Sequence, residues 1–267
     1  MRVLLAQSAS QPGDPAANAR AVGESLAAHP GTELAVFPEL FLTGYDLAAA
    51  GERALDPADP ALTTVAEHAR AADAAVIVGY VERLDGGGVA NSVACFDRDG
   101  RQAGTYRKTH LFGHESEVFS PGDDLLVVEL AGRRVAPLVC FDVEFPEPAR
   151  AVARAGAELL VTVAANMDPY GPDHDLAVRA RALDNRLPHV YVNRVGSEYG
   201  LDFVGGSAVV AADGRALVRL GGEAAERAAD VDLESRPESA VDYLRLVRPA
   251  LPVSDLTITT TTQGATR

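Results

Sequence analysis

The sequence predicts an α/β protein in which a core of packed sheets is covered on the outside by helices. Three observations support this class. Apolar runs of strand length alternate with helical patterns through most of the chain, and two Asp-Pro pairs, at Asp14 and Asp59, have the form of helix starts. Several neighbouring strands are also separated by short turns rich in Asp and Gly. Hairpins combined with helical crossovers indicate mixed sheets packed face to face.

The strands that we expect share apolar or β-branched residues between turn signals. They are Arg2–Gln7, Leu34–Phe37, Ala75–Val81, Ala90–Phe96, Gln102–Arg107, Leu125–Leu130, Arg134–Val139, Leu159–Val163, Val190–Asn193, Val204–Val210 and Arg215–Leu220. The helices that we expect are Pro15–His29, Pro60–Ala71, Pro146–Ala155, His174–Arg186 and a late helix over Glu238–Val247. With no internal repeat and no linker, residues 1–248 are predicted to form one domain. Residues 249–267, rich in Pro, Thr and Ser, are predicted to be an extended or disordered tail.

Composition excludes several functional classes. The chain of 267 residues has 24 Lys and Arg against 38 Asp and Glu, a formal net charge of -14. Nucleic acids and anionic membranes bind basic surfaces, so neither is expected as a partner. The N-terminal segment lacks the long apolar run of a signal peptide, and two cysteines are too few for a disulfide framework. We therefore expect a cytoplasmic protein.

Cys140 is the first candidate for chemistry. It follows a predicted strand and precedes the polar turn FDVEFPE, which leads into a helix. A thiol at such an elbow lies near backbone N–H groups that can lower its pKa or bind an oxyanion. The alternative is a buried cysteine that packs as a small hydrophobic residue, which fits Cys95 within its strand.

Glu39 and Lys108 also follow predicted strands. On their own, Glu39 can be a carboxylate at a helix start and Lys108 a solvated lysine, but an acid, an amine and a thiol at three strand ends favour nucleophilic catalysis. His114 and Glu115 begin like a zinc-binding HExxH motif, but Val118 stands where the second histidine belongs, so no metal is expected. The serine-hydrolase elbow, the phosphate-binding loop and the dinucleotide fingerprint are all missing from the sequence.

Taken together, three segments resemble the nitrilase superfamily of carbon–nitrogen hydrolases. They are FPELFLTGY at 37–45, YRKTHLF at 106–112 and LVCFDVEFPE at 138–147, and the Glu, Lys and Cys that they carry are 69 and 32 residues apart. The resemblance covers about residues 2–246, and the segments AANMDPY at 164–170 and VRARALDN at 178–185 are similar to the aliphatic amidase branch, including 5-aminopentanamidase-like enzymes. It implies a four-layer α-β-β-α sandwich and a homodimer or higher homo-oligomer.

The resemblance also implies roles for individual residues. Glu39 would be the general base and acid, Lys108 the electrophilic stabiliser and Cys140 the nucleophile. Glu115 would be a second glutamate that orients Lys108 or the substrate, with Glu117 as the alternative. The substrate-binding residues would be Tyr45, Phe141, Glu144, Asn166 and Met167. No metal or organic cofactor is implied.

The implied reaction is hydrolysis of a small primary carboxamide to a carboxylic acid and ammonia through a thioester. Glu144 and Asp142 follow the nucleophile with no cation before Arg150, which predicts a neutral or cationic substrate unless Arg194 also faces the pocket. Glu144 can instead cap the next helix or pair with a structural arginine. The alternative functions are a nitrilase, an N-carbamoyl amide hydrolase, and an interaction protein without catalysis.

Overall fold

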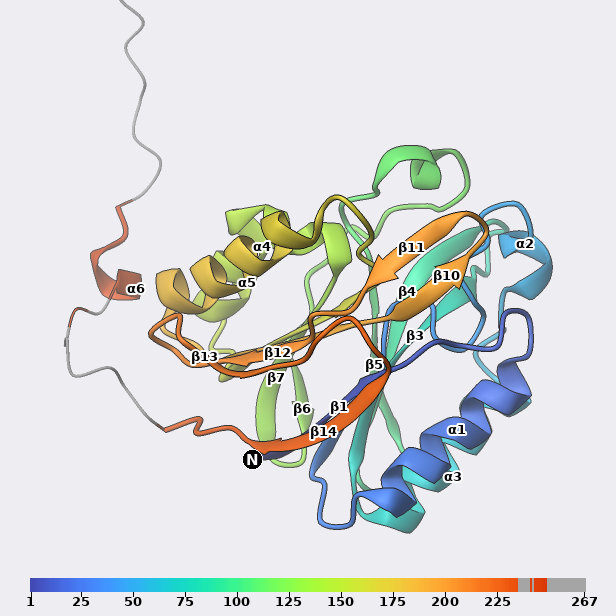
Figure 1. The fold of residues 1–267 in the computed structure, drawn as a ribbon, viewed down its shortest axis with the longest axis horizontal. Coiled ribbons are helices and arrows are strands. Elements are labelled where there is room, and N and C mark those ends of the chain that lie inside the picture. Colours follow the sequence, from blue (N-terminus) through green and yellow to red (C-terminus); the bar gives the residue numbers. More distant parts are fainter. Residues whose placement is uncertain (235–240, 242, 249–267) are drawn as a thin grey trace, which may run out of the picture.

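Two mixed sheets packed face to face form the centre of the molecule, with helices on both outer sides (Figure 1). The computed structural model describes residues 1–234, 241 and 243–248; the predicted tail at 249–267 lies outside the described residues. Within the described part of the chain, each large sheet has six strands. The predicted four-layer α-β-β-α sandwich is thereby confirmed.

The first sheet is built around parallel strands near its middle and antiparallel strands at its edges. Its order is β14 (Ala225–Asp230), β1 (Arg2–Gln7), β2 (Leu34–Val36), β3 (Ala75–Arg83), β4 (Val89–Phe96) and β5 (Gln102–Arg107). Helices α1 (Pro15–Ala28) and α3 (Pro60–Ala72) cover its outer face. Both begin as predicted, because the side chain of Asp14 accepts from the Ala17 amide and that of Asp59 accepts from the Ala61 amide.

The second sheet has the order β13 (Ala216–Arg219), β12 (Ala208–Val210), β9 (His189–Asn193), β8 (Leu159–Ala164), β7 (Arg133–Val139) and β6 (Val128–Leu130). Helices α4 (Pro146–Arg154) and α5 (Gly171–Asn185) pack on its outer face. Alternation along β1 places Val3 and Leu5 in the core between the sheets, and Leu4 and Ala6 against α1 and α3. Side-chain direction in the strands therefore assigns each residue to one layer.

Some elements differ from the sequence-based predictions. The strand predicted over Val204–Val210 is two strands, because Gly205 and Gly206 adopt positive φ angles of 62° and 75° between β11 (Leu201–Val204) and β12. β11 pairs with β10 (Val195–Glu198), an unpredicted hairpin, and α2 (Ala50–Arg53) and β14 were also not predicted. Of the late helix, Tyr243–Leu246 forms α6, while Glu238, Ser239, Ala240 and Asp242 lie outside the described residues. None of the helices in the described residues is long and apolar enough to span a bilayer.

Candidate active site

The three sequence candidates lie together where the two sheets bring their strand ends to the same side. β2 and β5 run in the same direction in the first sheet, and β7 is parallel to β8 in the second. Glu39, Lys108 and Cys140 follow β2, β5 and β7, and the segment Ala165–Met167 follows β8. Topology thus assembles a site from residues that are far apart in the sequence.

Glu39 is fully buried and each of its oxygens accepts hydrogen bonds. Oε1 accepts from Lys108 Nζ at 2.8 Å and from Asn91 Nδ2 at 2.7 Å, and Oε2 accepts from the Ala165 amide at 2.7 Å. The carboxylate therefore bridges the two sheets, because Asn91 and Lys108 belong to the first and Ala165 follows a strand of the second. Such partners compensate the desolvation of a buried charge.

The backbone around Glu39 passes very close to β3. Leu40 adopts a positive φ of 50°, and Gly79 accepts from the Leu42 amide and donates to the Pro38 carbonyl. A Cβ at Gly79 would lie 2.4 Å from the Leu40 nitrogen, closer than any van der Waals contact allows. Glycine at this position is thus required for the path that places Glu39 in the site.

Lys108 lies between two carboxylates. Its Nζ is 2.8 Å from Glu39 Oε1 and 2.8 Å from Glu115 Oε2, and all three side chains are almost fully buried. Burial lowers the pKa of Lys108, but Glu39 and Glu115 raise it more, so the net pKa is well above the usual value. The ammonium is therefore a permanent positive charge at the centre of the site.

Glu115 lies in the short 3₁₀ helix Gly113–Glu117, and its carboxylate is fixed from three sides. It accepts from the Tyr45 hydroxyl at 2.8 Å and from the Phe112 amide at 2.8 Å, in addition to Lys108. Glu117 instead is exposed and pairs with His114, away from Lys108. Of the two glutamates considered from the sequence, the structure brings only Glu115 to the site.

Cys140 occupies a strained elbow. Its φ is 46°, in the left-handed region that residues with a Cβ rarely adopt, and it begins the 3₁₀ turn Cys140–Glu144. This conformation costs about 1–3 kcal/mol, and residues held in it cluster at active sites, although Asp73 and Arg186 adopt it here at helix C-termini. Burial and the nearby Glu39 raise the pKa of the Cys140 thiol well above its usual value, although Lys108 lowers it. The raised pKa favours the protonated thiol, so Cys140 would have to lose its proton before it could act as a nucleophile.

Asp142 fixes the elbow and is not among the described residues that line the pocket. Its buried carboxylate accepts from the Val139 amide, the Tyr106 and Thr109 hydroxyls and the His110 amide, at 2.8–3.0 Å. The expectation that Asp142 repels a carboxylate substrate is therefore wrong, because its charge is directed into the protein. The five-residue turn is also held from α5, where Arg181 donates to the Val143 and Glu144 carbonyls.

The pocket in front of Cys140 contains all five side chains expected to bind the substrate. Tyr45, Phe141, Glu144, Asn166 and Met167 line it. Phe112, Tyr170 and His174, which the sequence analysis did not single out, line it too. Its volume is about 20 Å³, enough for about one water molecule, so only a small group fits beside the thiol without movement of the walls.

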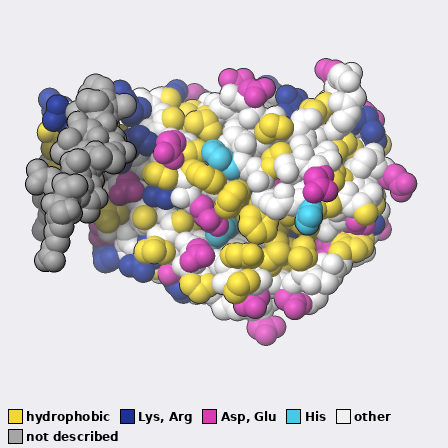
Figure 2. All heavy atoms as spheres, turned by 90° about the horizontal axis from the view of Figure 1, so that it is seen from above, with side chains coloured by type: hydrophobic (Ala, Val, Ile, Leu, Met, Phe, Trp, Pro, Cys, Tyr) yellow, Lys and Arg dark blue, Asp and Glu magenta, His cyan; other side chains and the backbone are white. Residues whose placement is uncertain are grey.

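Arg194 does not face this pocket. It is buried, donates to Glu198 Oε2 at 2.5 Å and lies over the ring of Phe203. Glu198 in turn accepts from the Tyr45 amide, and the Phe203 ring packs against the Tyr45 ring. The β10–β11 hairpin therefore supports Tyr45 from behind. The face of the molecule seen in Figure 2 shows mainly apolar and acidic side chains, with basic ones mainly toward its margins.

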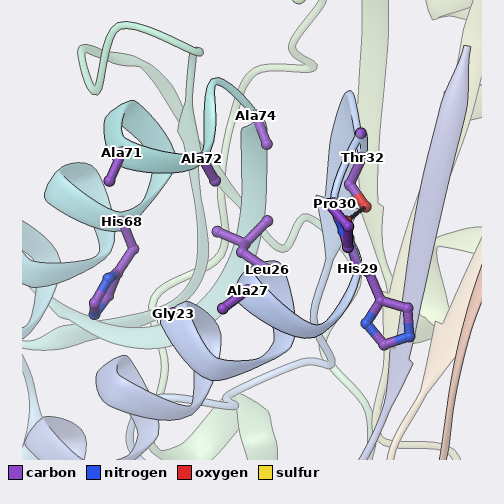
Figure 3. Close-up of a pocket in the computed structure, with 11 residues that line it drawn as sticks. Gly23, Leu26, Ala27, His29, Pro30, Thr32, His68, Ala71, Ala72 and Ala74 are labelled. Atoms are coloured by element: carbon purple, nitrogen blue, oxygen red, sulfur yellow. Dashed lines mark hydrogen bonds between the residues drawn. The ribbon is translucent and has the colours of Figure 1, made fainter.

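Among the described residues, a larger hollow lies away from this site, between the C-terminal halves of α1 and α3 (Figure 3). It measures about 490 Å³, and its walls are mostly small and apolar, with His29 and His68 as the titratable side chains. The two imidazoles do not point toward each other in the figure, and no cysteine, lysine or carboxylate is among the described residues that line the hollow. Of the two hollows, the one at Cys140 is the one lined by a cysteine, a lysine and a carboxylate in the described residues.

Comparison with known proteins identifies the class. The sequence model for carbon–nitrogen hydrolases matches residues 2–239. The chain is 39% identical over 249 residues to an (R)-stereoselective amidase of a Pseudomonas species, covering 91% of this chain and 89% of that enzyme. It is 30% identical to an omega-amidase of Xenopus tropicalis, with coverage of 85% and 83%.

A solved structure agrees with these sequences. The amidase of Nesterenkonia sp. AN1 superimposes with a TM-score of 0.82 at 30% identity, covering 93% of each chain. One of its variants, with glutamine in place of a glutamate, carries the acetamide moiety of fluoroacetamide on the active-site cysteine. The chain belongs to the carbon–nitrogen hydrolase family, the nitrilase superfamily. Within that superfamily its similarities lie with the aliphatic amidase branch, as the sequence analysis predicted.

Proposed function

We propose that this protein is a cysteine-dependent amidase that hydrolyses a small primary carboxamide to a carboxylic acid and ammonia. The observation that carries the proposal is the placement of the Glu39–Lys108–Glu115 cluster next to Cys140 in its strained elbow. The naming of relatives as amidases supports the same reaction. The catalytic roles below are proposals for the residues of this chain.

Acylation begins when Glu39 removes the proton of the Cys140 thiol as sulfur adds to the amide carbonyl. The raised pKa of Cys140 makes this proton transfer necessary, since the thiolate is the nucleophile. The carbonyl π electrons move to oxygen, and the resulting oxyanion is stabilised by the Lys108 ammonium and the Phe141 backbone N–H. A preorganised donor of this kind contributes about 3 kcal/mol.

Glu39 then transfers the proton to the amide nitrogen, the C–N bond breaks and ammonia leaves a thioester on Cys140. Water adds to the thioester as Glu39 accepts its proton, and collapse of the second intermediate releases the carboxylic acid and restores the thiol. Glu115 holds Lys108 in place in both half-reactions, with Tyr45 fixing the Glu115 carboxylate.

The proposed substrate has a neutral or cationic chain. Apart from Lys108, which is already paired with two carboxylates, no basic Lys or Arg lines the pocket in the described part of the chain. Glu144 lines it with its side chain 33% exposed, so a substrate carboxylate would be repelled and an ammonium attracted. The charge of an ω-amino or ω-guanidino carboxamide complements this wall, and binding of its chain requires the side chains around the pocket of about 20 Å³ to move.

Release of ammonia from matched amides, nitriles and N-carbamoyl compounds tests the reaction. We expect hexanamide and 5-aminopentanamide to be hydrolysed, 5-aminopentanamide with the higher kcat/KM and glutaramate with the lowest. Preferential turnover of hexanenitrile would assign the chain to the nitrilase reaction, and turnover of N-carbamoyl compounds alone to the other alternative. Preference for glutaramate would contradict the role of Glu144 and leave the amidase chemistry standing.

A further inference from the structure

A buried histidine stands directly behind Glu144 in the pocket wall. His174 lies in the first turn of α5, and its Nε2 is 3.2 Å from Glu144 Oε1. The His174 side chain is 4% exposed, against 33% for Glu144, so the histidine approaches the carboxylate from the protein side. On its other side, Nδ1 of His174 is 3.0 Å from the Tyr191 hydroxyl.

These contacts determine where the imidazole carries its hydrogen. Burial raises the pKa of Tyr191 well above its usual value, so the phenol keeps its proton and can donate it to Nδ1. The hydrogen of a neutral ring then lies on Nε2, the nitrogen that is 3.2 Å from Glu144 Oε1, and a ring protonated on both nitrogens also carries a hydrogen there. A neutral ring with its hydrogen on Nδ1 would direct a lone pair at the carboxylate and is disfavoured.

The direction of the Glu144 side chain depends on this contact. The backbone of Glu144 is held by Arg181, which donates to its carbonyl at 2.9 Å, but that bond leaves the side-chain torsions free. In the part of the chain that the structure describes, the His174 imidazole lies against the Glu144 carboxylate, 3.2 Å from Oε1. Oε2 remains available to a ligand in the pocket, where the rings of Phe112, Phe141 and Tyr170 also form the wall.

We propose that His174 is a positioning residue for substrate selection: it holds Glu144 so that one carboxylate oxygen receives the distal ammonium of the substrate. This inference rests on the proposed amidase function and deepens it. A glutamate fixed before binding loses less side-chain entropy when the substrate arrives. The aromatic rings beside it add cation–π attraction for the same ammonium.

The experiment compares two substrates of nearly equal shape, 5-aminopentanamide and hexanamide, which differ in whether the chain ends in an ammonium or a methyl group. In His174→Phe, the ring is kept and the donor is lost. We expect kcat/KM for 5-aminopentanamide to fall about tenfold, mainly through KM, a loss equivalent to about 1.4 kcal/mol. The kcat/KM for hexanamide should fall by much less, so that the ratio of kcat/KM between the two substrates drops about tenfold, and the urea midpoint of unfolding shows separately that the variant is folded.

Two further variants separate positioning from general damage. His174→Gln places an amide donor near the position of Nε2 and should restore selectivity to within about threefold of the wild type. Glu144→Gln should lose the same selectivity, and the double variant His174→Phe with Glu144→Gln should lose no more than Glu144→Gln alone, because the two residues act as one unit.

Equal losses on both substrates in His174→Phe, or additive losses in the double variant, would overturn the inference while leaving the amidase proposal in place. A wild-type enzyme that hydrolyses hexanamide without preferring 5-aminopentanamide would overturn it as well. Failure of the wild type to hydrolyse any amide would instead reject the proposed function itself.

Discussion

Replacing Glu39 by glutamine changes the charge of the site while keeping its shape. Glu39 accepts hydrogen bonds on both oxygens, from Lys108 and Asn91 on one side and from the Ala165 amide on the other. Glutamine has one acceptor oxygen, so in either orientation its NH₂ group faces a donor. An unsatisfied buried group of this kind costs about 1–3 kcal/mol, which we expect as the loss in the free energy of unfolding.

Activity should fall far more than stability. Without the Glu39 carboxylate, the proposed acceptor for the Cys140 proton is lost, and general base catalysis typically contributes about 10²- to 10⁴-fold. We therefore expect kcat/KM for hexanamide to fall by at least about 10²-fold in Glu39→Gln, measured by ammonia release. The urea midpoint of unfolding, measured in parallel, should move only modestly.

The pKa of Cys140 gives the same substitution a second readout. Burial raises this pKa first and Glu39 raises it further, whereas Lys108 lowers it. Removing the Glu39 charge leaves Lys108 less neutralised, so the pKa of Cys140 should fall and more thiolate should be present at a given pH. Thiolate absorbance titrated against the Cys140→Ala variant measures the shift, which is expected to go downward.

Glu82→Gln is the matched control, because Glu82 is also a buried, ion-paired glutamate and lies outside the pocket. It should be destabilised yet retain turnover. A Glu39→Gln protein with more than about a tenth of the wild-type rate would refute the base role, since a lost general base cannot leave so much activity. An unchanged or raised Cys140 pKa would refute the electrostatic argument.

Three further substitutions test the rest of the site. Cys140→Ala should abolish hydrolysis, and mass spectrometry of quenched wild-type enzyme should show an acyl group on Cys140. Cys95→Ala should remain active, because burial between the sheets raises the pKa of the Cys95 thiol to about 12. Lys108→Arg should lose about 10²-fold or more in kcat, since the wider guanidinium does not fit between two carboxylates, and a rate near that of the wild type would contradict this. Tyr45→Phe removes a hydroxyl that donates to Glu115 at 2.8 Å. The kcat should fall about tenfold with KM nearly unchanged. An unaltered kcat would show that the other partners of Glu115 hold its carboxylate in place without Tyr45.

Local patterns predicted most of the elements on which the site is built. β1 and β5 begin and end where the sequence predicts them, and α1 and α3 begin at their Asp-Pro pairs. These signals work because strand alternation and helix capping depend on residues close together in the chain. β14 shows where prediction from local sequence fails. Its sequence AERAAD has no strand pattern, yet it pairs with the whole of β1, because the backbone of β1 offers hydrogen-bonding groups to a neighbouring strand whatever that strand's side chains are.

For the site, the sequence by itself determined which strand ends carry the acid, the amine and the thiol, through three short motifs. Only the tertiary structure decided what holds them. Asn91 carries no signal within its strand, yet it donates to Glu39; Asp142 has its charge directed into the protein; and His174 reaches Glu144 from a helix 30 residues away. Those contacts join residues distant in sequence, and they form only when two sheets and a helix pack together, which no local pattern encodes.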